Sequence, residues 1–173
     1  MTNILPLAMM DETAIEALLD EAFGADRHAR TAYAIRAGMR WLPDLSFACV
    51  DEDGALLGLL QSWPVALADE DGEATPLVMV GPVAVLPAHQ GDGHGKALMD
   101  VLMKAARTAA TPPLVMIGDP EYYGRFWGFS ARHTGGWRVP GPVDPKRLLA
   151  VSLQGETLPE RGILGPRVKQ KAA

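Results

Sequence analysis

A strand, a glycine-rich turn and the start of a helix follow one another in Val83-Ala84-Val85-Leu86-Pro87-Ala88-His89-Gln90-Gly91-Asp92-Gly93-His94-Gly95-Lys96-Ala97-Leu98. Apolar residues then recur at helical spacing as far as Ala109, which predicts an amphipathic helix after the glycines. The first N–H groups of a helix lack intrahelical partners and lie at the positive end of its dipole. Gly91, Gly93 and Gly95 remove the side chains that would keep a diphosphate away from these groups. The stretch therefore predicts an anion site.

Two other phosphate-binding patterns fit this turn poorly. A Walker loop ends in Gly-Lys-Ser/Thr, and here Gly95-Lys96 is followed by Ala97, which has no hydroxyl for magnesium. A dinucleotide site requires Gly-x-Gly-x-x-Gly near the first strand of a parallel sheet. The glycines here alternate, and the turn follows several elements with antiparallel character. Both patterns are set aside.

Upstream of the turn, the pattern predicts a short strand, two helices and a hairpin. An apolar run covers 4–8, and a helical spacing of apolar residues covers 15–23 and precedes Gly24. Asp11 and Thr13 are both cap candidates for this helix, with Glu16 three residues beyond Thr13. A weaker helical pattern covers 28–38, and its charges are expected to form a solvated face; they are carried by Arg27, Arg30 and Arg36.

Two further apolar runs, 45–50 and 55–65, flank a turn ending in Asp-Gly, which predicts an antiparallel hairpin. The next run, 76–86, contains Gly81-Pro82. Since proline removes a ladder hydrogen bond, this strand should bulge or part from a neighbour there.

Downstream of the long helix, the chain predicts a buried strand, a short helix and closing strands. Leu114–Ile117 is a short apolar run between chain breakers, as expected for a central strand. Asp119-Pro120 begins a short helix that reaches Trp127, and apolar runs follow over 129–132 and 148–153. Residues 1–153 are predicted to form one domain, and the Gly- and Pro-rich segment 154–173 a loosely held C-terminal tail.

Composition limits the function classes. A length of 173 residues fits one domain. The formal net charge of −5 argues against a protein that coats nucleic acid. No run of 18 apolar residues and no basic signal-peptide start occur, so no membrane association and a cytoplasmic location are expected. The single cysteine, Cys49, is predicted to be a buried reduced thiol because its neighbours are apolar.

The turn closely resembles the acyl-CoA-binding motif of the GNAT N-acetyltransferase superfamily, a Val-x-Val strand followed by Pro and Gln/Arg-x-x-Gly-x-Gly/Ala. Gln90, Gly93 and Gly95 match this motif in order. The element order over residues 1–153 is also similar to that family. The resemblance implies an α/β (α+β) fold with a mixed, mostly antiparallel sheet flanked by helices.

A second resemblance lies in Gly118-Asp119-Pro120-Glu121-Tyr122-Tyr123-Gly124-Arg125-Phe126-Trp127-Gly128-Phe129. Members of the family commonly carry a tyrosine shortly before Gly-Phe, with its hydroxyl at the CoA sulfur. The double tyrosine after Gly-Asp-Pro looks like a bacterial subgroup of predicted acetyltransferases. The usual spacing is Tyr-x-x-x-Gly-Phe, and Trp127 looks like an extra residue, so either Tyr123 or Tyr122 faces the sulfur.

The resemblance implies transfer of the acetyl group of acetyl-CoA to a primary amine by direct attack in a ternary complex. Tyr123, with Tyr122 as the alternative, would protonate the departing thiolate, and a backbone N–H near Val85 would meet the thioester oxygen. The implied cofactor-binding set comprises Val83, Val85, Gln90, Gly91, Asp92, Gly93, His94, Gly95, Lys96 and Tyr123. No metal is expected, because His89 and His94 lack companions at zinc spacing and are interpreted as lining the diphosphate turn.

Several alternatives stay open at this level. The chain could instead be a non-catalytic acyl-CoA sensor or interaction module, since no general base is evident. Asp119, Glu121 and Glu73 are candidate bases by position only. Asp92 replaces the basic residue often found in the family's turn, so either its side chain points away from the phosphates or CoA affinity is reduced. The amine acceptor, small molecule or protein, is not identified, and the oligomeric state is open, with a homodimer as one assembly.

Residues that could line the acceptor pocket are the aromatic residues and arginines near the second helix and the closing strands. The set comprises Trp63, Trp137, Arg27, Arg30 and Tyr33. Packed tryptophans and solvated arginines are the competing interpretation. The acidic surface favours a cationic amine acceptor.

Overall fold

The computed structural model describes residues 2–168. Contacts between Cα atoms divide these residues into two compact units, neither of which is continuous in sequence. Unit 1 runs as far as Ala29 and continues through Trp41–Ser62 and Val80–Thr111. Unit 2 comprises Arg30–Arg40, Trp63–Met79 and the chain from Pro112 onward. Strands β3 (Leu56–Ala68) and β4 (Ala74–Val85) contribute residues to both units.

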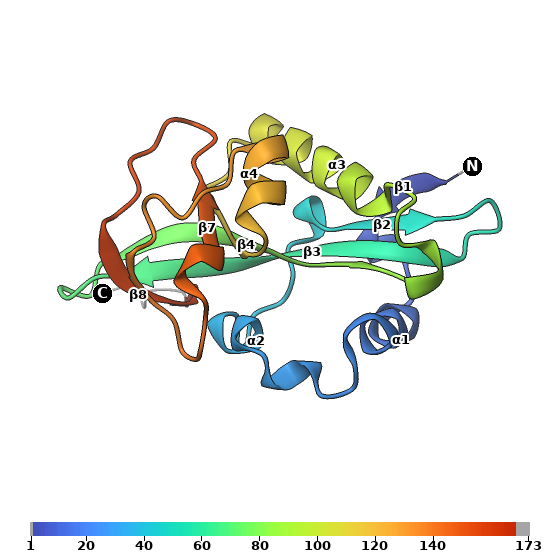
Figure 1. The fold of residues 1–173 in the computed structure, drawn as a ribbon, viewed down its shortest axis with the longest axis horizontal. Coiled ribbons are helices and arrows are strands. Elements are labelled where there is room, and N and C mark those ends of the chain that lie inside the picture. Colours follow the sequence, from blue (N-terminus) through green and yellow to red (C-terminus); the bar gives the residue numbers. More distant parts are fainter. Residues whose placement is uncertain (1, 169–173) are drawn as a thin grey trace. The chain divides into compact units, whose positions relative to one another are not determined.

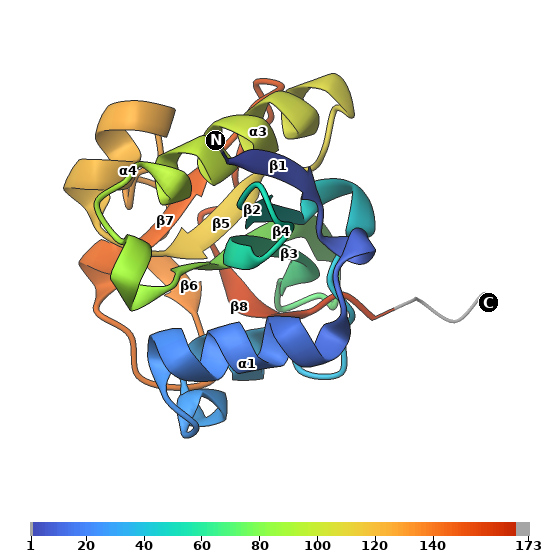
Figure 2. The same ribbon diagram turned by 90° about the vertical axis from the view of Figure 1, so that its right-hand side faces the viewer.

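Unit 1 consists of strands between two helices. The strands β1 (Asn3–Pro6), β2 (Phe47–Val50), β3 and β4 are hydrogen-bonded in that order, and β1–β2 and β2–β3 are antiparallel. Helices α1 (Glu12–Phe23) and α3 (His94–Thr108) lie on opposite faces of these strands, as both views show (Figures 1 and 2). The predicted hairpin is confirmed, with Phe47 opposite Leu60.

The alternation of side chains in β2 explains how unit 1 buries both faces of its strands. Ala48 and Val50 pack with Leu19 of α1 in one apolar cluster. Cys49 points to the other face and is a free, buried thiol, as the sequence predicts. Burial is the main cause that raises the pKa of this thiol, so it is protonated at neutral pH.

Unit 2 contains the parallel pairing of the sheet. Strand β5 (Leu114–Ile117) is parallel to β4 and antiparallel to β7 (Leu148–Val151). Strand β8 (Arg161–Pro166) is antiparallel to β3 and parallel to β6 (Gly136–Arg138). Figure 1 shows α2 (Thr31–Ile35) and α4 (Pro120–Trp127) on opposite sides of these strands. The sheet is therefore mixed and mostly antiparallel, as predicted.

Short 3-10 helices connect the main elements. They are η1 (Leu7–Met9), η2 (Arg27–Ala29), η3 (Pro43–Leu45), η4 (Pro87–His89) and η5 (Pro145–Arg147). The segment 28–38, predicted as one weak helix, is thus divided between η2 and the short α2. None of the helices in the described part of the chain combines the length and the apolar character that a membrane crossing requires.

Local signals placed the ends of α1 and α4 correctly, and of the two cap candidates for α1 the cap is Asp11 rather than Thr13. The Asp11 carboxylate accepts a hydrogen bond from the Thr13 N–H at 3.3 Å, and α1 ends at Gly24. The Asp119 carboxylate accepts from the Glu121 N–H at 3.0 Å at the start of α4. Such caps satisfy amides that have no partner within the helix.

Two predictions are wrong. The segment after Gln154 is not a loose tail as far as it is described, because β8 pairs with two strands and Leu164 is fully buried. Residues 169–173 of that predicted tail lie outside the described residues. Of the three arginines predicted to form a solvated face near the second helix, Arg30 is exposed, but Arg27 and Arg36 are buried. Arg27 pairs with Glu16 and Asp20 of α1, which compensates for its loss of hydration.

The predicted interruption at Gly81-Pro82 is the point by which β4 has parted from its neighbouring strand β5. Strand β4 remains a strand through Val85. Its parallel pairing with β5 covers Val78 and Met79, and within residues 2–168 the register ends there.

Candidate active site

The glycine-rich turn leads from the end of β4 through η4 into the N-terminus of α3. Gly91 and Gly93 have φ of +89° and +83°, in the left-handed region that favours glycine. No protein atom lies within 4 Å of a Cβ placed on either residue. Backbone conformation, rather than crowding by the protein, therefore requires these two glycines. Both residues lie just before α3, where their missing side chains leave room for an anion near the helix N-terminus.

Gly95 lies in the first turn of α3 and faces the end of β4. A Cβ placed on it would be 4.0 Å from methyl groups of both Val83 and Val85, an ordinary contact. These two valines are half-buried, and Ala84 between them packs in the core with α1. The Gln90 amide donates to the Val85 carbonyl at 3.4 Å and ties the turn back to the strand. The structure thus brings the cofactor-binding residues predicted in unit 1 into one place.

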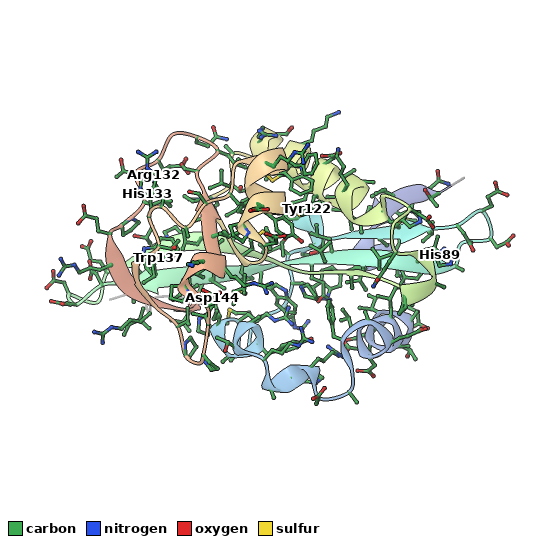
Figure 3. The ribbon with its side chains drawn as sticks, viewed as in Figure 1. His89, Tyr122, Arg132, His133, Trp137 and Asp144 are labelled. Carbon is green, nitrogen blue, oxygen red and sulfur yellow. The ribbon has the colours of Figure 1, made fainter. Side chains whose placement is uncertain are left out.

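Side chains of the turn point toward protein partners. Lys96 forms an exposed ion pair with Asp100 at 3.1 Å. One Asp92 carboxylate oxygen lies 3.9 Å from Nδ1 of His89 and 3.9 Å from Nε2 of His94. Of the two outcomes left open for Asp92, the structure favours a carboxylate directed at the imidazoles. His94 is buried, and His89 lies half-buried at the end of η4 (Figure 3).

The two candidate tyrosines lie on α4 of unit 2, and their surroundings differ. Tyr122 is exposed (Figure 3), whereas Tyr123 is half-buried. A Cβ on Gly118 would lie 2.7 Å from a Tyr123 ring carbon, so only glycine at the end of β5 leaves room for this ring. The rings of the two tyrosines meet edge to face, with centroids 5.0 Å apart. The packing holds Tyr123 in place more firmly than Tyr122.

The C-terminus of α4 accommodates the additional residue in the tyrosine motif. Trp127 is the last residue of the helix and is buried, with its ring 5.7 Å from that of Tyr123. Gly128 then adopts φ of +80°, and the Phe129 N–H donates to the Tyr123 carbonyl. A glycine in this conformation ends helices by satisfying their last carbonyls.

Burial raises the pKa of Tyr123 above its ordinary value. Coupling to the neighbouring Tyr122 phenol and the negative charge of Asp119 act in the same direction, and the nearby Arg147 acts against them. The hydroxyl of Tyr123 is therefore protonated across the neutral range and is able to donate a hydrogen bond.

The candidate bases have structural roles or lie in solvent. The Asp119 carboxylate caps α4, and Glu121 is exposed beside it. Glu73 is exposed in the turn between β3 and β4, where its N–H donates to Asp69.

The candidate acceptor-pocket residues divide into four structural settings. Arg30 is exposed in unit 2, immediately before α2. Arg27 belongs to unit 1, where it pairs with acidic residues of α1. Trp137 is buried in unit 2, and its indole N–H donates to the Pro159 carbonyl. Trp63 and Tyr33 flank the Arg36 guanidinium, which lies 3.8 Å and 4.1 Å from their ring centroids. The aromatic spacing in the sequence could not indicate this stack, because Tyr33 and Trp63 come from separate segments.

Comparison with known proteins identifies the family. Residues 13–118 match the model of the acetyltransferase (GNAT) family, which is more than half of the chain. The chain belongs to the acetyltransferase (GNAT) family. It is accordingly an enzyme of the N-acetyltransferase class. The match contains the whole glycine-rich turn and ends at Gly118, so the tyrosine segment and the bacterial subgroup it suggests stay predictions.

Individual GNAT relatives support the same assignment. The uncharacterized N-acetyltransferase YhbS of Escherichia coli strain K12 is 29% identical over 134 residues, covering 76% of this chain and 77% of the relative. A GNAT family acetyltransferase from Brucella melitensis, solved in complex with acetyl-CoA, is 28% identical, with a TM-score of 0.67 and coverage of 94% and 93% of the two chains. The crystal structure of YhbS with CoA has a TM-score of 0.70 at 23% identity, covering 96% and 89%, and supports the fold.

Proposed function

We propose that this GNAT protein transfers the acetyl group of acetyl-CoA to a primary amine by direct attack in a ternary complex. The observation that carries the proposal is the pair of left-handed glycines, Gly91 and Gly93, which lie just before α3 with no protein atom near the place of their missing side chains. The acetyl-CoA complex of the Brucella melitensis relative supports acetyl-CoA as the donor. In this assignment the amides of residues 90–96 bind the diphosphate, and the Val83 and Val85 side of β4 contacts the cofactor.

The chemistry requires few special side chains. A neutral amine attacks the thioester carbonyl, and a C–N bond forms as the C–S bond breaks. Holding both reactants in one site supplies much of the rate. A backbone N–H near Val85 would stabilise the charge that develops on the thioester oxygen. Water would accept the proton released by the amine, in keeping with the structural roles and solvent exposure of the candidate carboxylates.

Tyr123 is the preferred donor to the departing sulfur. Its ring is fixed over Gly118, and its hydroxyl stays protonated because burial raises its pKa. A hydrogen bond from this hydroxyl would stabilise the thiolate as it leaves. Tyr122 is the alternative, with an exposed and less constrained ring.

Calorimetry with acetyl-CoA and release of free thiol across a panel of amines test the function. Binding together with acceptor-dependent release supports the enzyme. Tight binding without release by any amine would instead support the acyl-CoA sensor, and no heat of association would remove both functions.

The tyrosine assignment is tested separately with Y123F and Y122F. General acid catalysis contributes roughly 10²–10⁴-fold, so Y123F should lose at least tenfold in turnover while acetyl-CoA affinity changes little. Y122F is the matched control, since it removes the neighbouring hydroxyl from the same helix. A loss confined to Y122F would transfer the role to that residue, and full activity of the double variant would exclude it for both.

We also propose a cellular location, a class of acceptor and an assembly for this enzyme. A cytoplasmic location is supported by the free, buried Cys49, since reduced thiols are typical of that compartment. A cationic amine is the favoured acceptor because the chain carries net negative charge. A homodimer is the proposed assembly to test, and sedimentation velocity would distinguish it from a monomer.

A further inference from the structure

Three metal-binding groups of unit 1 converge at the turn before α3. The side chains are His89 at the end of η4, Asp92 in the turn and His94 at the first position of α3. Each offers one ligand atom, and the three atoms all lie within 4.8 Å of one another. The carboxylate oxygen is 3.9 Å from each imidazole nitrogen. The sequence offers His89 and His94 no Cys or His companion at zinc spacing, and their third partner is the carboxylate of Asp92, which lies between them in the chain.

The position of His94 is fixed by the core. About one tenth of its side chain is exposed, and its Nδ1 lies 3.5 Å from the Cys49 thiol on β2. This contact leaves Nε2 directed at Asp92. Within residues 2–168, no hydrogen bond reaches this nitrogen, since the Asp92 oxygen at 3.9 Å is beyond hydrogen-bond range. On a side chain this buried, an Nε2 atom without such a bond is available as a ligand when Nδ1 carries the ring hydrogen and directs it at the Cys49 sulfur.

The surroundings carry negative charge. The three side chains line a cavity of about 710 Å³ together with the β2–β3 turn, which contributes Asp51, Glu52 and Asp53. Among the described residues that line this cavity, four are acidic and none is Lys or Arg. The field of these carboxylates raises the local concentration of cations.

The distances require little movement to bind an ion. Zinc takes nitrogen and oxygen ligands at about 2.0–2.2 Å in tetrahedral geometry, which places neighbouring ligand atoms about 3.4 Å apart. Asp92 is exposed and His89 half-buried, so both side chains can close the remaining gap while His94 stays fixed.

We propose that His89, Asp92 and His94 form a binding site for a divalent transition-metal ion of the zinc type, with the remaining position open to water. Two imidazoles and one carboxylate favour such an ion over Mg²⁺, which prefers an all-oxygen site. The site is formed by side chains, whereas the proposed diphosphate site is formed by backbone amides of the same turn. Metal binding is therefore measurable without acetyl-CoA and does not depend on the proposed activity.

The test titrates the metal-free protein with ZnCl₂ by calorimetry and with CoCl₂ by visible absorption. We expect one ion per chain and Co²⁺ bands of a nitrogen- and oxygen-ligated site, without a thiolate charge-transfer band. Losing a ligand should cost at least the roughly 10–100-fold known for residues that support ligands. H89A and D92N should therefore each lower Zn²⁺ affinity at least tenfold.

H133A is the matched control because His133 is exposed in unit 2 (Figure 3). It should bind Zn²⁺ as the unaltered chain does, and MgCl₂ should give no comparable heat. Unchanged Zn²⁺ affinity in H89A and D92N, equal loss in H133A, or no Zn²⁺ binding by the unaltered chain would each overturn the proposal. Unchanged melting temperatures of the variants without metal would show that any loss reflects the site rather than unfolding.

Discussion

Replacing Gly93 by alanine separates the cost of a left-handed residue from the requirements of cofactor binding. Gly93 is the residue immediately before α3, with φ of +83° and open space where the alanine methyl group would lie. Gly72, in the turn between β3 and β4, has φ of +79° and equally open space. G93A and G72A thus introduce the same methyl group at nearly the same left-handed φ, one inside the proposed diphosphate site and one outside it.

The magnitude follows from the backbone. A side chain in the left-handed region costs about 1–2 kcal/mol, so each variant should lose that much free energy of unfolding. For a chain of this size this loss lowers Tm by roughly 2–8 °C. If the backbone of the turn leaves the left-handed conformation in G93A, CoA binding must return it to that conformation. The cost of about 1–2 kcal/mol then weakens the Kd for CoA by roughly 5–30-fold.

Thermal denaturation and calorimetry with CoA measure the two effects without knowledge of the amine acceptor. We expect G72A to lose stability while its Kd for CoA stays within twofold of the original. G93A should weaken CoA binding at least fivefold. A G93A protein that binds CoA as tightly as G72A would refute the assignment of these amides to the diphosphate.

Three further predictions concern groups away from the turn. Burial raises the pKa of Tyr123. Absorbance titration of the unaltered chain at high pH should therefore show a phenol that ionises above the ordinary pKa of about 10, and this phenol should be missing in Y123F. A high-pH tyrosine signal unchanged by Y123F would contradict this. In urea denaturation, L164A should lower the free energy of unfolding by about 2–5 kcal/mol. The control I163A alters the neighbouring residue on β8, whose side chain is 59% exposed, and should change that free energy by less than about 0.5 kcal/mol. Equal effects of the two variants would show that β8 is not packed as described. R36A should lower the free energy of unfolding by at least the cation–π contribution of about 0.5–2 kcal/mol. The control is R132A, because Arg132 is exposed (Figure 3). Equal melting temperatures of the two variants would argue against the aromatic stack.

Local features of this fold were predictable because neighbouring residues determine them. Asp11 and Asp119 cap helices through amides two residues further along the chain. The Asp-Gly turn at 53–54 fixes the hairpin between β2 and β3, and the Asp51 carboxylate accepts from the Asp53 and Ala55 N–H groups at 2.9 Å. The backbone of the glycine-rich turn is likewise set locally, since glycine adopts the left-handed φ values of Gly91 and Gly93 without strain.

Features that depend on distant segments were missed or misjudged. Composition made 154–166 look like a tail, yet β8 is held by partners in β3 and β6. Arg36 looked solvated because charged residues usually are, and its aromatic partner Trp63 is 27 positions away in the chain. Gly118 gave no local signal of its role, which follows from the fold of α4 back over the end of β5.

The sequence alone determined the family resemblance, the ends of α1 and α4 and the glycine-rich turn before α3, because each rests on backbone preferences over a few consecutive residues. The tertiary structure alone decided which side chains meet: Tyr123 over Gly118, Arg36 between two aromatic rings, and Asp92 between two imidazoles. These contacts depend on the burial of apolar surface that joins separate segments, and no local pattern encodes that pairing.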